Sequence, residues 1–185
     1  VRALTILFNT CISAGVHPSK WKLSNVAVAF KGKGSPHIPS NYRPLSLTSI
    51  MGKLMESLVV DHLSTELEDR GYFTRHHGRF RRGTGCTEPL AFVTELWHSV
   101  MNESSRHHCR KCHVILCDVQ KFFDRICRKS VLWKCHYQAG ISGNILIWIE
   151  SFLTNRKQRV VDNRSGSSSE WLENNMGVPQ GGVIS

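Results

Sequence analysis

The stretch from residue 113 to residue 124 constrains the fold more than any other. It begins with the apolar run His-Val-Ile-Leu-Cys, which is typical of a short buried strand, and Asp118 stands where this run ends. An ionised carboxylate at the edge of an apolar layer costs several kcal/mol unless a metal, a cation or amide donors compensate it. Asp118 is therefore the leading candidate for chemistry. The alternative is that Asp118 only caps a helical turn that begins after it.

The charge of the chain favours a polyanionic partner. Lys and Arg number 24 against 14 Asp and Glu, which gives a formal net charge of +10. No apolar window is long enough for a membrane span, and the start has no secretory signal. The seven cysteines are irregularly spaced, as in proteins with reduced thiols, so we expect a location in the nucleus or cytoplasm. Because the chain begins at Val1 and stops inside an apolar run, we also expect it to be a fragment.

Hydrophobic periodicity predicts a mixed chain of helices and strands. Helices are expected over residues 2–14, 49–70, 129–139 and 143–153, and strands over residues 24–30 and 158–161. A further helix should start near Thr87 and face inward through Leu90, Val93, Trp97, Val100 and Met101. His62 lies on the apolar stripe of the second helix, and we interpret it as a buried imidazole.

Three loops carry candidate binding residues. Arg43 precedes a proline and is held extended, so it could aim its guanidinium at a phosphate, although a solvated surface Arg fits equally well. A basic loop mixes cations with aromatic rings, which suits single-stranded nucleic acid, the alternative being a solvated basic loop. Its candidates are Arg75, Phe80, Arg81 and Arg82. Near the end, Pro179 fixes the backbone, Gln180 offers a donor and an acceptor, and Gly181 with Gly182 lets another molecule approach the main chain closely.

The cysteines near residue 110 allow two less favoured hypotheses. The spacing of Cys109, Cys112 and His113 matches a c-type haem attachment site, but there is no export signal and the motif runs into the expected strand. A zinc site could use Cys109, Cys112 and Cys117, yet no fourth ligand stands at structural spacing. Thiols without a metal are the default interpretation.

The ordered set of motifs resembles the reverse transcriptase domain of non-LTR (LINE-type) retrotransposons. Each landmark is weak alone, but together they keep the family's order over nearly the whole chain. The landmarks are Trp21 with Lys31, residues 42–47, Lys53 with Glu56, Gly78 with Phe80 and Arg81, residues 118–124, residues 148–153 and residues 177–181.

The resemblance implies an α+β right-hand polymerase fold, with fingers and a palm that is incomplete at the C-terminus. Residues 1–110 would be fingers-like, and residues 111–126 would hold the first palm strand and the catalytic segment. Residues 127–172 would be a helical and hairpin insertion, and residues 173–185 the start of the second palm motif.

The same resemblance implies residue roles and partners. Asp118 would be the catalytic carboxylate and, with the backbone of Val119, would help to hold two Mg²⁺ ions. Phe123 resembles the aromatic gate that selects dNTPs, and the incoming nucleotide would also meet Lys31, Arg43, Gln180 and Gly181. The partners would be an RNA template and a DNA primer, with protein partners unknown.

Some features of the sequence depart from the family pattern. The family's remaining carboxylates belong to an aromatic-Ala-Asp-Asp hairpin beyond the Pro179–Gly181 turn, so we expect the fragment alone to be inactive. Phe122 stands in place of the usual Ala, Gly182 in place of Ser and His76 in place of Gln, and Arg79 resembles an insertion. These changes leave an alternative open, a non-catalytic, decayed retroelement remnant that at most binds nucleic acid.

Overall fold

The computed structural model describes residues 2–74, 83, 85, 87–102, 113–162 and 165–184. They belong to two compact units. Unit 1 consists of Val1–Asp61 and Lys121–Ser185, and unit 2 of His62–Gln120. Unit 1 contains the sheet and most of the described helices.

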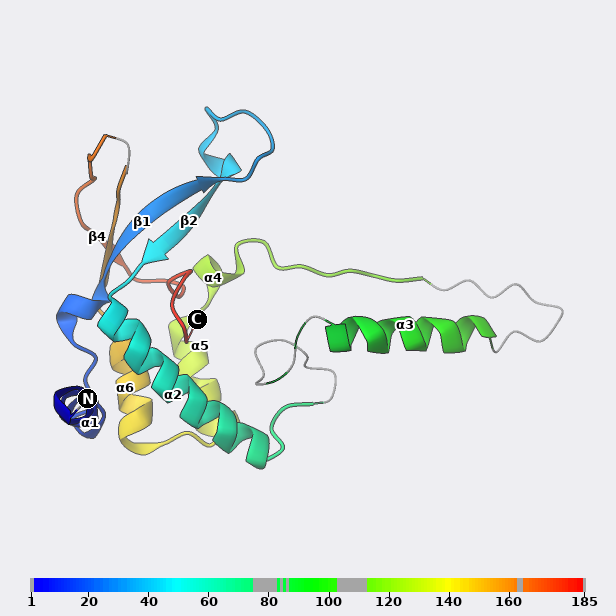
Figure 1. Ribbon diagram of the computed structural model, residues 1–185, viewed down its shortest axis with the longest axis horizontal. Helices are drawn as coiled ribbons and strands as arrows, with labels where there is room; N and C mark the ends of the chain where they lie inside the picture. Colours follow the sequence, from blue (N-terminus) through cyan, green and yellow to red (C-terminus); the bar gives the residue numbers. More distant parts are fainter. Residues whose placement is uncertain are drawn as a thin grey trace. The chain divides into compact units, whose positions relative to one another are not determined.

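The described strands of unit 1 form one sheet in the order β2-β1-β3-β4. β1 is antiparallel to β2 and parallel to β3, and β3 is antiparallel to β4 (Figure 1). Their bounds are Leu23–Phe30 for β1, Tyr42–Leu47 for β2, Arg156–Val160 for β3 and Leu172–Asn174 for β4. The predicted strands over residues 24–30 and 158–161 are thus confirmed.

Strand β2 was not predicted, because Pro44 argues against a strand. β2 lies at the edge of the sheet, with Pro44 opposite Val28 and Ser46 opposite Val26. The N–H of Ser46 points away from β1, since it bonds to Gln180, and Pro44 has the same orientation two residues earlier. The missing N–H of Pro44 therefore removes no hydrogen bond between β1 and β2. Sheets accept proline under this condition.

The helices of unit 1 gather at one end of the sheet (Figure 1). Helix α1 packs against α6, which also contacts α5. The bounds are Arg2–Ser13 for α1, Phe122–Arg125 for α4, Arg128–Trp133 for α5 and Gly143–Leu153 for α6, with a π-helical turn at Lys134–Gln138 and 3-10 turns at Ser19–Lys22 and Pro39–Asn41. The helices predicted over residues 2–14 and 143–153 are confirmed, and the one over 129–139 is α5 continued by the π-helical turn.

A histidine lies inside the aromatic core of unit 1. The ring of His17 is 1% exposed and makes edge contacts with Trp21, Trp148 and Phe152 at centroid distances of 5.6, 5.3 and 5.2 Å. Among the described residues neither ring nitrogen has a hydrogen-bond partner. Burial lowers the pKa of His17 to about 3, and the positive charges of Arg156 and Lys22 act in the same direction. The backbone near Trp21 weakly opposes this shift. His17 is therefore neutral at physiological pH.

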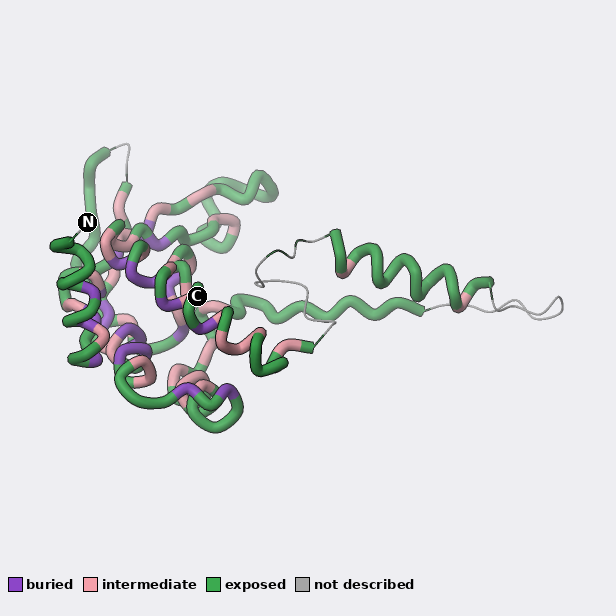
Figure 2. Tube along the Cα trace, turned by 60° about the horizontal axis from the view of Figure 1, so that its bottom comes forward, coloured by how far each residue is buried: buried purple, intermediate pink, exposed green. Residues whose placement is uncertain are grey.

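Unit 2 contains the end of α2 and all of α3. Helix α2, Ile50–Asp69, confirms the long helix predicted over 49–70, and α3 spans Thr87–Asn102. No residue of α3 is buried (Figure 2). Leu90 and Trp97 are 66% and 51% exposed. The predicted inward face of α3 is therefore wrong. An apolar stripe is buried only where another element covers it, and within the described part of unit 2 no element covers this one.

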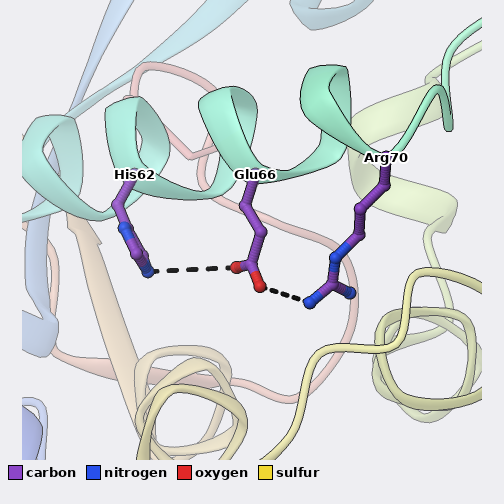
Figure 3. A network of polar contacts seen from close by, with 3 residues as sticks. All are labelled: His62, Glu66 and Arg70. Atoms are coloured by element: carbon purple, nitrogen blue, oxygen red, sulfur yellow. Dashed lines mark hydrogen bonds and ion pairs between the residues drawn. The ribbon is translucent and has the colours of Figure 1, made fainter.

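His62 on α2 is exposed, so the prediction of a buried imidazole is wrong. Its Nε2 lies 3.9 Å from a carboxylate oxygen of Glu66, whose other oxygen accepts from Arg70 (Figure 3). The three residues are spaced four apart and form a polar stripe on the helix surface.

The predicted buried strand at residues 113–117 is also wrong. Residues 113–119 have no strand assignment and are all exposed, with Ile115 and Leu116 at 84% and 92%. An apolar run becomes a buried strand only when neighbouring strands satisfy its backbone groups, and no described strand pairs with this one. Asp118 is exposed as well, so burial does not single it out.

Candidate functional site

The turn at residues 177–182 is fixed to two parts of unit 1 by backbone hydrogen bonds. On one side the N–H of Ser46 in β2 donates to the carbonyl of Gln180 at 2.9 Å. On the other side the N–H of Val178 donates to the carbonyl of Phe123 in α4, also at 2.9 Å. The turn, drawn in red in Figure 1, therefore bridges the sheet edge and α4.

Two glycines make this close approach possible. A Cβ atom on Gly177 would lie 2.4 Å from the carbonyl oxygen of Phe123, and one on Gly181 would lie 2.8 Å from that of Ser46. Both residues also have positive φ angles, 68° and 123°. The sequence predicted that Gly181 would let another molecule approach the main chain, and in this structure its close neighbour is the backbone of Ser46 in β2. The tighter approach, at Gly177, was not predicted from the sequence.

Arg128, the first residue of α5, holds the segment that leads into the turn. Its Nε donates to the carbonyl of Gly177 at 2.7 Å, and its two terminal nitrogens donate to the carbonyls of Asn174 and Met176 at 2.7 and 3.0 Å. A fourth bond reaches Oδ1 of Asn174 at 2.9 Å. Burial lowers the pKa of Arg128. Nothing in the local sequence indicated this role, because the acceptors are backbone carbonyls more than forty residues away.

We expect Arg128→Lys to destabilise unit 1 by about 1–2 kcal/mol, because an ammonium group cannot reproduce the planar fork and leaves carbonyls unpaired. Urea unfolding followed by tryptophan fluorescence measures this change. Arg125→Lys is the matched control, since Arg125 is exposed and lies three residues away. Equal midpoints for the two variants would contradict this role of Arg128.

A cavity of about 270 Å³ lies beside the turn. Its wall combines apolar residues such as Val26 and Pro44 with five polar ones. The polar residues are Ser46, Asp124, Gln158, Asn174 and Gln180. Gln158 and Asn174 are joined by a hydrogen bond of 3.0 Å. The cavity thus offers hydrogen-bonding groups and one carboxylate next to the predicted site residue Gln180.

The predicted phosphate-binding cations do not line this cavity. Arg43 is exposed and alternates along β2 with Pro44 and Ser46, so it lies on the opposite face of the strand. Lys31 follows β1, and its Nζ donates to the carbonyl of Ser40 at 2.6 Å.

The predicted aromatic gate does lie beside the turn. The carbonyl of Phe123 is bonded to Val178, and its ring makes an edge contact with the ring of Phe122 at a centroid distance of 5.7 Å. Phe122 itself is 53% exposed. The structure therefore brings Phe123, Gln180 and Gly181 together.

The described residues do not complete a metal site. Asp118 and Val119 are exposed residues of unit 2. Within the described ranges there is no group of three or more His, Cys, Asp or Glu that could hold an ion. Cys117 is exposed, while Cys109 and Cys112 lie outside the described residues. One carboxylate does not satisfy a divalent cation that prefers several oxygen ligands.

The predicted nucleic-acid contacts Arg75, Phe80, Arg81 and Arg82 also lie outside the described residues. Among the helices that the structure describes, none has the length and apolar character needed to cross a membrane.

The chain belongs to the reverse transcriptase (RNA-dependent DNA polymerase) family, whose model matches residues 31–185. This match includes most of the mixed sheet and the whole bridging turn. Enzymes of this family generally use divalent metal ions and act on RNA templates and DNA primers.

Similar proteins occur in Drosophila. The chain is 26% identical to a probable RNA-directed DNA polymerase from transposon BS of Drosophila melanogaster, and 28% identical to the RNA-directed DNA polymerase from mobile element jockey of Drosophila funebris. It is also 26% identical to a probable polymerase from transposon X-element. Each match covers 98% of this chain but 19% of the relative. The chain therefore spans about a fifth of the length of these relatives.

Proposed function

We propose that this chain is part of an RNA-directed DNA polymerase that transfers dNMP from a dNTP to a primer 3′-hydroxyl on an RNA template. The observation that carries the proposal is the turn of Gln180 and Gly181, which is bonded at once to β2 and to the backbone of Phe123. The family match over residues 31–185 and the relatives named as RNA-directed DNA polymerases support it.

We assign the nucleotide site to residues around this turn. Gln180 lines the polar cavity. We assign the ring of Phe123, whose backbone is bonded to the turn, as the gate that excludes a ribose 2′-hydroxyl. Lys31 and Arg43 meet the triphosphate from the other face of the β1–β2 pair, which requires the nucleotide to reach around the edge strand. The division into fingers and palm belongs to this proposal.

Asp118 is proposed as the first catalytic carboxylate and, with the backbone of Val119, as part of an Mg²⁺ site. Mg²⁺ would neutralise charge on the triphosphate and on the attacking oxygen. Because the described residues hold no cluster of metal ligands, these residues alone do not complete that site. We also propose that residues 1–185 alone do not extend a primer, because the resemblance places the family's remaining carboxylates beyond the Pro179–Gly181 turn.

The decisive experiment is primer extension by a longer chain that includes these residues. With a primed RNA template, Mg²⁺ and dNTPs we expect extension, and Asp118→Ala should reduce it to background. Asp69→Ala, at another exposed aspartate, should leave the rate unchanged. Extension that survives Asp118→Ala would refute the assigned role.

A non-catalytic remnant that binds nucleic acid is the competing outcome, and the net charge of +10 favours binding of this kind. It is supported if the longer chain fails to extend a primer but binds RNA with an affinity that falls steeply with salt.

A further inference from the structure

Glu56 is a buried carboxylate that the proposed polymerase chemistry does not use. It lies on α2 with 1% of its surface exposed, between the buried residues Met55 and Val59. Its Oε2 accepts the N–H of Val183 at 2.7 Å and that of Ile184 at 3.4 Å. One carboxylate oxygen thus receives two successive backbone donors from a segment 127 residues further along the chain.

A carboxylate is an expensive residue at such a position. Met55 and Val59 beside it on α2 are buried and apolar, and an aliphatic side chain would pack there without the cost of burying a charge. Burial raises the pKa of Glu56, while the hydrogen bonds from Val183 and Ile184, and at longer range the charges of Arg156 and Lys53, act in the opposite direction. What Glu56 provides, and an aliphatic residue cannot, is an acceptor for the two backbone N–H groups.

The segment that Glu56 holds follows directly after the turn at residues 177–182. Arg128 holds the chain before the turn, Ser46 bonds to the carbonyl of Gln180 at its tip, and Glu56 holds the chain after it. Without Glu56 the chain after the turn would lose both of these hydrogen bonds, while the bonds of Arg128, Phe123 and Ser46 to the turn would remain. The bond between Ser46 and Gln180 would then have to position the tip without support from the chain after it.

We propose that Glu56 is a positioning residue, which fixes residues 183 and 184 so that Gln180 and Gly181 stay seated against strand β2. The seating of the turn stands independently of catalysis. Its consequence for nucleotide binding rests on the proposed polymerase function.

The seating is tested by amide hydrogen exchange in the 185-residue chain, with Ser46 as the reporter because its N–H bonds to the turn. In Glu56→Ala, exchange at Ser46 should accelerate about tenfold or more, whereas amides of the β1–β3 ladder should change little. Glu56→Gln keeps an oxygen acceptor and should restore slow exchange. Glu66→Gln, the same change at a partly exposed site on the same helix, should leave Ser46 unaffected.

Two results would overturn the seating role. Exchange that accelerates equally at Ser46 and in the β1–β3 ladder would show that Glu56 only stabilises the unit as a whole. Slow exchange at Ser46 in Glu56→Ala would show that the turn does not need this carboxylate.

The catalytic consequence is tested in a longer chain that extends a primer. Glu56→Ala should raise the KM for dNTP about tenfold with a smaller change in kcat, and Glu56→Gln should recover most of the KM. An unchanged KM in an active enzyme would refute the consequence alone. A wild-type longer chain that does not extend a primer would refute the proposed function, and the exchange result would still decide the seating role.

Discussion

Gly177→Ala is expected to destabilise unit 1 by about 2–5 kcal/mol and to dislodge the turn. A non-glycine residue at φ 68° costs about 1–2 kcal/mol. The added Cβ would also lie 2.4 Å from the carbonyl oxygen of Phe123, and a clash with backbone costs about 1–3 kcal/mol more. The measurement is urea unfolding followed by the fluorescence of tryptophans such as Trp148, which is fully buried in unit 1.

Gly166→Ala separates the two contributions. Gly166 has nearly the same φ angle, 71°, but a Cβ there would meet nothing within 4 Å. Its loss of stability should therefore be limited to the backbone cost of about 1–2 kcal/mol. If both variants lose the same amount, the contact between residue 177 and Phe123 has no energetic importance.

Acidification is expected to destabilise unit 1 through His17. Its pKa is about 3 in the folded chain and near 6.5 when the chain unfolds, so between these values the unfolded state binds more protons. The stability that depends on neutral His17 is complete above pH 6.5 and falls as the pH drops towards 3. The slope for one proton is about 1.4 kcal/mol per pH unit, so about 2–3 kcal/mol should be lost between pH 6.5 and 4.5.

His17→Phe provides the test, because it keeps an aromatic ring among Trp21, Trp148 and Phe152 but does not titrate. The dependence of unfolding free energy on pH should become flatter by nearly one proton over this window, whatever the absolute stability of the variant. Glu56 contributes a pH dependence of the opposite sign. Because its pKa is raised in the folded chain, the folded state binds a proton at a pH at which the unfolded state is still deprotonated. An unaltered slope in His17→Phe would contradict the assignment.

Periodicity predicted the elements that carry their own pattern. The helices at Arg2–Ser13, Ile50–Asp69 and Gly143–Leu153 were found because their apolar residues repeat at helical spacing. The prediction of a buried strand at residues 113–117 was wrong, because an apolar run indicates that a segment can be buried but not which element will cover it. The helix that was predicted to start near Thr87 is present as α3, but the prediction of its inward face failed for the same reason.

The candidate site was only partly predictable. Gln180, Gly181 and Phe123 belong to recognisable motifs, and the structure brings them together. Arg128 and Glu56 were not predicted as anchors, because each bonds to distant backbone groups whose positions only the tertiary fold determines. Asp118 was selected because it ends an apolar run, and its assignment now depends on the family match, since that run is exposed.

The bond between Ser46 and Gln180 also protects the sheet from self-association. β2 is an edge strand, and an edge strand with free N–H and C=O groups can recruit the edge of a second molecule. The turn occupies one of these groups, and Pro44 offers no donor two residues earlier. A change that releases the turn would therefore expose an edge able to pair with another molecule and would also displace Gln180, so that solubility should decline.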